Sequence, residues 1–214
     1  MSEPFVETAV VQVEESLKEI WKTYGFWAFF VGVAFFSVYP TCNWFGAHEA
    51  VSTYHLYLDA ELIIPFVPIF YWFYISLYVI FILPPLFMSV PELKVLGKRI
   101  IVATVISGII FIVFPTSLGF ERVVPTGFYA NLFSTIFSLD LPHNLVPSLH
   151  VVYSTFILLG AANAVQNNLL KGIFLVWLGL ISLSTVLVHQ HHIFDVVSAF
   201  VLVWIVSKFI KKGK

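Results

Sequence analysis

Charged residues are scarce in this sequence: Asp, Glu, Lys and Arg together make up 11% of its 214 residues. A soluble domain of this size carries about 25%. Here 59% of the residues are hydrophobic and the mean hydropathy is +0.94. These values exclude an ordinary water-soluble domain and indicate a single domain surrounded by lipid. The net charge of −1 argues against nucleic acid as a partner, so the expected partners are the bilayer and a membrane lipid.

The sequence also has little cysteine and no basic N-terminal leader. The single cysteine, Cys42, excludes an intrachain disulfide. The first 20 residues contain five glutamates where a secretory signal would be basic. Apolar residues recur there at helical spacing, which predicts an amphipathic helix over residues 1–22 on the membrane surface. A solvated helix that caps the rest of the domain fits the same pattern.

Long apolar runs fill the remainder of the chain. A helix needs about 20 apolar residues to cross a bilayer. Six segments predict membrane-spanning helices: 24–40, 62–88, 95–114, 146–165, 170–188 and 193–210. Four prolines lie in the second segment, so its ends are expected to be kinked or irregular. The expected fold is an all-α bundle of six transmembrane helices preceded by the amphipathic helix, in one domain over residues 1–214.

Basic residues are distributed unequally among the predicted loops. With six spans, ten Lys and Arg residues fall on one side of the membrane, and only Arg122 falls on the other. Cytoplasmic loops carry an excess of Lys and Arg, so both termini are expected in the cytoplasm. The Arg122 side, called the outer face below, is expected to be extracytoplasmic. Arg122 departs from this rule, which indicates a functional contact; a pair with its neighbour Glu121 is the structural alternative.

All seven histidines map to the outer face or its boundary: His48, His55, His143, His150, His189, His191 and His192. Ionisable groups near membrane spans are costly and commonly functional. His150 and His191 are 41 residues apart, which matches two spans of about 20 residues, so both can line one cleft. His191 and Asp195 are four residues apart and share a helix side, where the carboxylate can fix the imidazole tautomer. The other ring nitrogen is then a candidate nucleophile. A zinc site is the weaker alternative, because His189 and His192 point in other directions.

The stretch Pro147-Ser148-Leu149-His150 lies where the fourth predicted span begins. Proline suits the first turn of a helix. The free N–H groups of that turn, at Ser148, Leu149 and His150, would form an anion site. The Ser148 hydroxyl and the bidentate Arg122 can add to it. This pattern predicts a phosphate held beside the acid–base residue His150, with a capped helix and a hydrogen-bonded histidine as the structural alternative.

Two further outer segments contain candidate contacts. Residues 128–139 predict a short interfacial helix that either gates the entry of a lipid or packs against the bundle. The segment 48–66 contains polar residues that fit a headgroup contact about as well as a solvated loop or an interfacial helix: His48, Glu49, His55, Asp59 and Glu61.

These motifs resemble the type-2 phosphatidic acid phosphatase superfamily, which also includes the vanadium haloperoxidases. The signature of that superfamily is K-x6-R-P, then P-S-G-H, then S-R-x5-H-x3-D. Residues 147–150 resemble the second element, and residues 184–195 read S-T-x5-H-x3-D, which resembles the third. The first element places its arginine at Arg122. The resemblance covers residues 114–199, and the six-span plan extends it over most of the chain.

The resemblance implies phosphoryl transfer through a covalent phosphohistidine, with no metal or other cofactor. In it, His191 would attack phosphorus and Asp195 would orient His191. His150 would protonate the leaving oxygen and then activate the incoming water or alcohol. A placed general acid contributes about 10²–10⁴-fold, and the remainder of such catalysis is positioning and charge stabilisation. The residues implied to hold the phosphoryl oxygens are Ser148, Leu149 and Arg122.

The sequence departs from the signature at four positions. These are Leu149 (glycine in the family), Thr185 (arginine), Pro115 (lysine) and Val123 (proline). Only one of three phosphate-binding cations remains, which favours a monoanionic diester over a dianionic monoester. This is similar to the inositol phosphorylceramide synthases and sphingomyelin synthases, which transfer a phospho-headgroup between lipids. Thr185 and His189 are possible accessory residues, although a structural hydrogen bond is the favoured role of His189.

Three functions are therefore open. The first is hydrolysis of a lipid phosphate ester, and the second is transfer of a phospho-headgroup. The third, from another class, is a non-catalytic lipid-binding protein on a decayed enzyme fold. The presence of His150, His191 and Asp195 argues against decay, and the missing basic residues are its only support.

Overall fold

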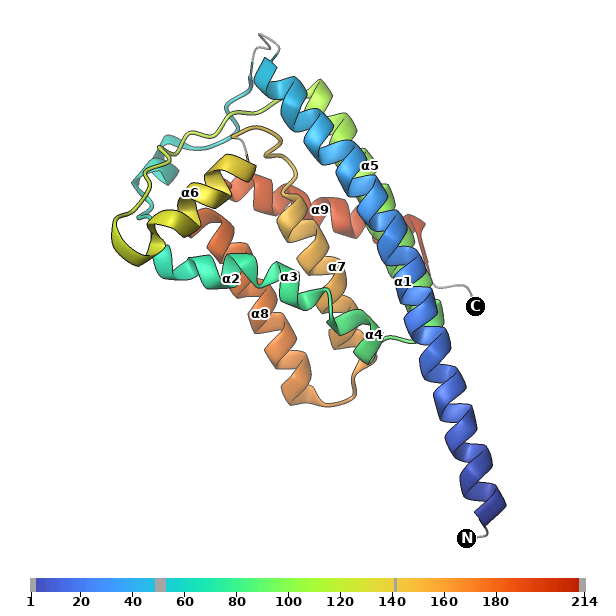
Figure 1. Ribbon diagram of the computed structural model, residues 1–214. Helices are drawn as coiled ribbons and strands as arrows, with labels where there is room; N and C mark the ends of the chain where they lie inside the picture. Colours follow the sequence, from blue (N-terminus) through green and yellow to red (C-terminus); the bar gives the residue numbers. More distant parts are fainter. Residues whose placement is uncertain (1–2, 49–52, 141, 212–214) are drawn as a thin grey trace.

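The computed structural model describes residues 3–48, 53–140 and 142–211; in the first range, side chains are described from residue 16 to residue 45. Within these residues every regular element is a helix, apart from one isolated β-bridge between Tyr54 and Thr116. The predicted all-α class is therefore confirmed. The long helices, shown in Figure 1, are α1 (Glu3–His48), α5 (Val90–Val113), α7 (Leu149–Ala164), α8 (Asn168–Leu187) and α9 (Ile193–Phe209).

Helices α1 and α5 lie side by side along one flank of the molecule (Figure 1). Two glycines of α5 make this close approach possible. A Cβ atom added at Gly97 would lie 2.5 Å from the ring of Trp27, and one added at Gly108 would lie 2.3 Å from the side chain of Val38. Both distances are far shorter than a van der Waals contact between carbon atoms. A larger residue at either position would therefore push the two helices apart.

The N-terminal region forms one continuous helix, where the sequence predicted two separate segments. The backbone has no break between residues 1–22, the predicted interfacial helix, and residues 24–40, the first predicted span, because α1 runs from Glu3 to His48 with Pro40 inside it. The side chains of residues 1–15 lie outside the described part of the chain. The amphipathic character predicted for them therefore stays a prediction.

The predicted second span, residues 62–88, is divided into several short helices. They are η2 (Pro68–Phe70), α2 (Tyr71–Ile75), α3 (Leu77–Ile80) and α4 (Leu83–Phe87). Between α2 and α3 the Ser76 hydroxyl donates to the Phe73 carbonyl at 2.6 Å. Pro84 and Pro85 have no N–H group, so α3 cannot continue through them. The irregularity expected from the prolines of this segment is therefore present, and it extends from the ends of the segment to its middle, at Ser76.

Helix α7 forms the centre of the bundle and contacts α3, α4, α5, α8 and α9. Val151, Val152, Ile157 and Leu158 on α7 have no exposed surface. A helix that is apolar on all sides is typical of the middle of a bundle, because every face meets another helix. The position of α7 matters for the site, because its first turn carries Ser148 and His150.

The outer end of the bundle carries three shorter elements, η1 (Asp59–Ile63), η3 (Gly127–Tyr129) and α6 (Ala130–Leu139). Helix α6 confirms the short helix predicted within residues 128–139. Its Phe133 is completely buried, with ring centroids 4.8 Å from Phe66 and 5.5 Å from Tyr71. This burial supports the packing interpretation of the segment.

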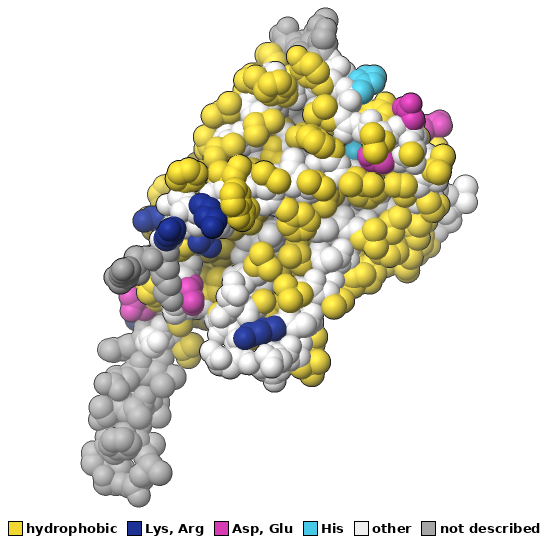
Figure 2. All heavy atoms as spheres, turned by 180° about the vertical axis from the view of Figure 1, so that it is seen from behind, with side chains coloured by type: hydrophobic (Ala, Val, Ile, Leu, Met, Phe, Trp, Pro, Cys, Tyr) yellow, Lys and Arg dark blue, Asp and Glu magenta, His cyan; other side chains and the backbone are white. Residues whose placement is uncertain are grey.

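Three helices of the described chain are long and apolar enough to cross a membrane, and they cover Ser16–Phe45, Val90–Val113 and Asn168–Leu187. The apolar helix α7 is shorter, at 16 residues. Figure 2 shows hydrophobic side chains over a broad part of one face, with Lys and Arg gathered toward one end and His at the other. This separation indicates membrane association, because a lipid-facing zone lies between two polar ends.

Candidate active site

The connector between α8 and α9, residues 188–192, carries the histidine-rich stretch. The amides of Gln190 and His191 both donate to the carbonyl of Thr185, each at 3.0 Å. His189 has a φ of 54°, which is uncommon for a residue with a side chain and reverses the chain here. Thr185 is fully buried and donates its hydroxyl to the Ser182 carbonyl at 2.8 Å. Thr185, which occupies the arginine position of the family signature, therefore holds this turn together.

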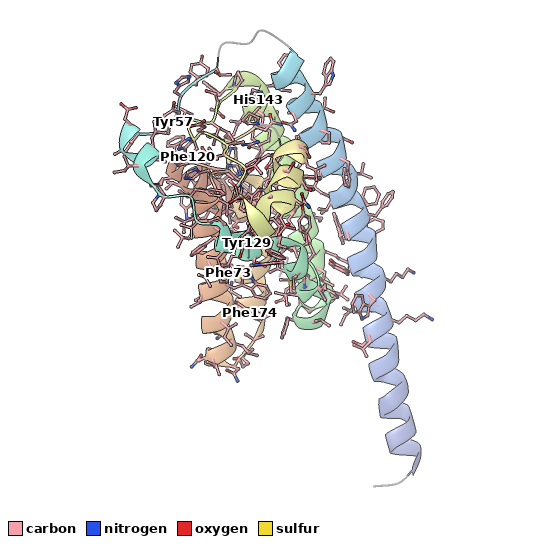
Figure 3. The ribbon with its side chains drawn as sticks, turned by 60° about the vertical axis from the view of Figure 1, so that its left-hand side comes forward. Tyr57, Phe73, Phe120, Tyr129, His143 and Phe174 are labelled. Atoms are coloured by element: carbon pink, nitrogen blue, oxygen red, sulfur yellow. The ribbon has the colours of Figure 1, made fainter. Side chains whose placement is uncertain are left out.

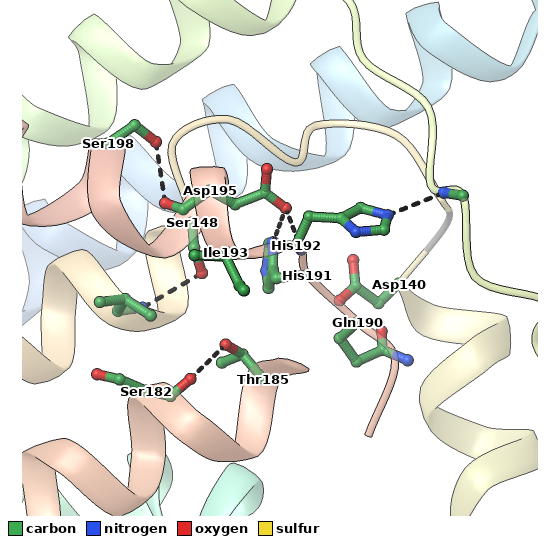
Figure 4. Close-up of polar contacts among 12 residues, drawn as sticks. Asp140, Ser148, Ser182, Thr185, Gln190, His191, His192, Ile193, Asp195 and Ser198 are labelled. Carbon is green, nitrogen blue, oxygen red and sulfur yellow. Dashed lines mark hydrogen bonds and ion pairs between the residues drawn. The ribbon is translucent and has the colours of Figure 1, made fainter. Parts of the chain in front are cut away.

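His191 and Asp195 form a hydrogen-bonded pair at the start of α9 (Figure 4). The His191 Nδ1 atom lies 3.2 Å from Asp195 Oδ2, and the same oxygen accepts the His192 amide at 2.8 Å. The side chains of the pair are only 9% and 2% exposed. The contact predicted from their four-residue spacing is confirmed. Because a carboxylate only accepts, Nδ1 of His191 carries the proton and Nε2 keeps its lone pair.

Ser148 connects the first turn of α7 to that of α9. Its amide donates to the Asp195 carbonyl at 3.2 Å, and its hydroxyl oxygen accepts the Val151 amide at 3.4 Å. Ser148 is therefore the N-cap of α7, which begins at Leu149. The expectation that Pro147 lies in the first turn was wrong, because Pro147 precedes the cap. Leu149 is buried, so only its backbone N–H is suited to hold a phosphoryl oxygen.

His150 lies in the first turn of α7 and packs flat on Tyr74, with ring centroids 4.0 Å apart. Its Nε2 atom is 2.6 Å from the carbonyl oxygen of Tyr74. A carbonyl only accepts, so Nε2 carries a proton and Nδ1 is the nitrogen that can exchange one. His150 lies two residues after Ser148, whose amide donates to the Asp195 carbonyl, so the first turn of α7 places His150 near the start of α9, where His191 and Asp195 lie. The structure thus brings together the two histidines that the sequence predicted to share a cleft.

Arg122 reaches across the outer end to two protein acceptors. It donates one Nη atom to the Asp140 carbonyl and the other to Gln190 Oε1 at 3.2 Å, and its guanidinium lies 5.2 Å from the centre of the Phe137 ring. Among the described residues no ion pair joins Arg122 to Glu121, so the alternative prediction of a pair between these two neighbours was wrong. Burial lowers the pKa of Arg122 because it disfavours the charged form.

A second histidine–carboxylate pair, which the sequence did not predict, lies beside the first. His192 Nδ1 is 3.2 Å from Glu61 Oε2, and His192 Nε2 accepts the Gly119 amide at 3.0 Å. Tyr57 and Phe120 stack on the His192 ring, each with centroids 4.4 Å apart, and both lie at the same end of the molecule (Figure 3). Burial lowers the pKa of His192, in agreement with a neutral ring whose Nε2 accepts a hydrogen bond.

Glu61 joins the outer segment to α9. It is 5% exposed, and its Oε2 also accepts the Ile193 amide at 2.9 Å. The solvated loop expected as one alternative for Glu61 was wrong, because Glu61 is buried within the short helix η1; the headgroup contact stays a prediction. One feature of the sequence could have indicated that Glu61 is buried. This is the apolar run from Leu62 to Phe66, which follows Glu61 directly.

The contacts of His189 are a hydrogen bond and ring stacking with other protein groups, as expected for a structural residue. Its Nε2 lies 3.0 Å from the Ile64 carbonyl, and its ring stacks on Phe120 at 4.0 Å between centroids. Burial lowers its pKa, which disfavours an accessory positive charge. In the part of the chain that the structure describes, no three His, Cys, Asp or Glu side chains are grouped as metal ligands would be.

Substitution of Glu61 tests whether this buried carboxylate holds the site together. Glu61→Leu should lower the free energy of unfolding by about 2–5 kcal/mol, because it leaves three donors, the buried His192 ring and the amides of Leu58 and Ile193, without an acceptor. Glu61→Gln keeps one acceptor oxygen and should cost less. Thermal unfolding of the purified protein measures both. Asp59→Leu, at an exposed position of η1, is the matched control; an equal effect of Asp59→Leu and Glu61→Leu would contradict the assignment.

Comparison of this chain with protein-family models, curated proteins and solved structures gives no match. The resemblance to the phosphatidic acid phosphatase superfamily therefore rests on the residues themselves and stays a prediction.

Proposed function

We propose that this chain is an integral membrane enzyme that cleaves or transfers phosphate esters of lipids through a phosphohistidine, with its site at the outer face. The observation that carries this proposal is the hydrogen-bonded pair of His191 and Asp195, which the Ser148 amide links through the Asp195 carbonyl to the first turn of α7, where His150 lies. Ser148 adds an N-cap hydroxyl and an amide bonded to the Asp195 carbonyl at the same place. Nucleophile, orienting carboxylate and acid–base group are the parts that phosphoryl transfer to a histidine needs.

In the first step, the lone pair on His191 Nε2 forms a P–N bond while the P–O bond to the lipid alcohol breaks. The leaving oxygen takes a proton from Nδ1 of His150; because burial disfavours the charged ring, His150 carries this proton only while the anionic substrate is bound. Asp195 holds the Nδ1–H of His191 and stabilises the positive charge that develops on its ring. Arg122 and the N–H groups at the start of α7 stabilise the phosphoryl oxygens.

In the second step, His150, now neutral at Nδ1, removes a proton from water or from an alcohol. The oxygen so activated forms a new P–O bond as the P–N bond breaks. This restores His191 and the protonated His150. The same machinery performs hydrolysis with water and transfer with an alcohol, so the acceptor decides the outcome.

Headgroup transfer from a phosphodiester is the second candidate. Both Nη atoms of Arg122 already donate to protein acceptors, and the Thr185 hydroxyl is bonded within α8. A site with one guanidinium and no second cation at the signature positions suits a monoanionic diester better than a dianionic monoester.

An assay on a panel of lipids tests the proposal. Purified protein in detergent would be given lipid phosphates, lipid pyrophosphates and phosphodiesters, with free phosphate and lipid products followed together. Free phosphate from the wild type would support the phosphatase, and a new phospholipid without free phosphate would support the transferase. A folded protein that forms neither product would contradict both and favour a lipid-binding protein.

Thiol labelling tests the proposed orientation, with both termini in the cytoplasm and the site outside. The buried Cys42 would be changed to alanine, and single cysteines placed at the exposed Glu121 and Gln166, the latter in the α7–α8 connection. An impermeant maleimide added to intact cells should label Glu121→Cys and should label Gln166→Cys only after permeabilisation. The reverse pattern would overturn the orientation.

A further inference from the structure

Three buried donor atoms at the outer end of the bundle have no acceptor. Within the described residues, the buried side-chain nitrogens without a hydrogen-bond partner are Arg122 Nε, His143 Nδ1 and Gln190 Nε2. Native proteins satisfy nearly all buried polar atoms, so such orphans need an explanation. Three of them on neighbouring residues indicate a group that is bound there during function.

The orientation of Gln190 follows from its partner. Arg122 has only donors, so the oxygen of the Gln190 amide must face it, and the structure places Oε1 3.2 Å from the guanidinium. The amide nitrogen is therefore turned away from Arg122. Gln190 is 1% exposed, so this nitrogen is shielded from bulk solvent, and it has no protein acceptor.

The three residues come from three different segments and meet around Arg122. Gln190 belongs to the α8–α9 connector and directly precedes His191. His143 lies before α7, at the end of the molecule that also holds Tyr57 and Phe120 (Figure 3), and it interacts electrostatically with Arg122. Arg122 and His143 keep partial exposure, so the cluster reaches the outer surface.

The chemistry of the three atoms selects an anionic ligand that is rich in acceptors. Each of the three nitrogens can donate a hydrogen bond, and Arg122 adds a positive charge. No described carboxylate lies within ion-pair distance of Arg122. The backbone carbonyl of Asp140 accepts a hydrogen bond from Arg122, while the Asp140 carboxylate accepts hydrogen bonds from the hydroxyls of Tyr39 and Tyr74. A phosphate group supplies several charged acceptors at one point and fits this arrangement.

We propose that Gln190 and His143 complete, with Arg122, a subsite that binds the oxygens of a phosphate group next to His191. This inference rests on the proposed function and deepens it: two uncharged donors replace the cations that the sequence lacks at Pro115 and Thr185. The same chemistry would hold the phosphate of a lipid headgroup or a free inorganic phosphate.

Gln190→Glu is the decisive variant. The new carboxylate keeps an oxygen toward Arg122 and pairs with it, so the fold is retained. It removes the amide donor and places a negative charge where the phosphate would bind. His143→Phe is the second variant, because it keeps an aromatic ring in place and removes the ring nitrogens, Nδ1 among them. Gln166→Glu, the same exchange at an exposed position of the α7–α8 connection, is the matched control.

Affinity would be measured by thermal stabilisation, separately for inorganic phosphate and for a short-chain diacylglycerol phosphate. A His191→Asn background prevents turnover during the measurement. We expect Gln190→Glu to weaken binding by at least tenfold and His143→Phe to weaken it by several-fold, with Gln166→Glu unchanged. Loss for the lipid alone assigns the subsite to the headgroup, and loss for inorganic phosphate alone assigns it to the free anion.

Unchanged affinity of Gln190→Glu for both phosphates, or no phosphate binding by the parent protein, would overturn the subsite. These outcomes are separate from a failure of the proposed function. If the protein binds phosphate through Gln190 but shows no turnover with His191 intact, the subsite proposal stands and the proposed enzymatic function is contradicted. If the Gln190→Glu variant turns over lipid phosphates as well as the wild type, the proposed enzymatic function stands and the subsite proposal is contradicted.

Discussion

His191→Asn should reduce turnover of the lipid substrate by about 10³-fold or more, because asparagine cannot form the P–N bond. The asparagine amide can still donate a hydrogen bond toward Asp195, so the start of α9 should keep its geometry. Steady-state product formation by the purified variant, beside its melting temperature, separates loss of chemistry from loss of fold. An unchanged melting temperature with turnover at background is the expected result.

His55→Asn is the matched control for this variant. His55 is exposed in the outer segment and does not contact the pair of His191 and Asp195 in the structure. It should keep turnover close to that of the wild type. Wild-type turnover in His191→Asn would show that His191 is not the nucleophile. An equal loss of turnover in His191→Asn and His55→Asn would show that the effect is not specific to His191.

His150→Phe should show a loss that depends on the leaving group. For a lipid phosphate, whose leaving alcohol needs a proton, turnover should fall by about 10²–10⁴-fold. For an aryl phosphate with a weakly basic leaving oxygen, the fall should be much smaller. The phenyl ring keeps the stacking on Tyr74, so folding should be retained. Rates for the two substrates, measured with one preparation of enzyme, give the comparison.

The same two substrates given to His191→Asn provide the reference, because loss of the nucleophile should suppress both equally. Equal suppression of both substrates in His150→Phe would contradict its role as the proton donor to the leaving group. That result would leave His150 as a structural residue held by the Tyr74 carbonyl.

The local part of the candidate site was predictable from the sequence. The contact between His191 and Asp195 follows from a spacing of four residues, and the shared face of His150 and His191 follows from two span lengths between them. Both relations depend only on the period of a helix and the thickness of a bilayer. The structure confirms the contact at 3.2 Å and brings the two histidines together.

The long-range part was not predictable from one sequence. Glu61 and His192 are 131 residues apart, and Arg122 and Gln190 are 68 apart. No local pattern encodes such pairs, because they depend on how the outer segments fold over the bundle. The prolines of residues 62–88 predicted irregular ends, but the break in the middle of the segment was missed, because hydropathy detects the apolar length of a segment and not the interruption at Ser76.

Trapping of the covalent intermediate tests the central claim most directly. The enzyme would be mixed with a lipid substrate that carries radioactive phosphorus, stopped within one turnover in alkali, and digested for mapping of the label. Phosphohistidine withstands alkali and is lost in acid, so we predict an acid-labile label on the peptide that contains His191. Turnover without a labelled chain in the wild type, or with the label on a different residue, would contradict the account.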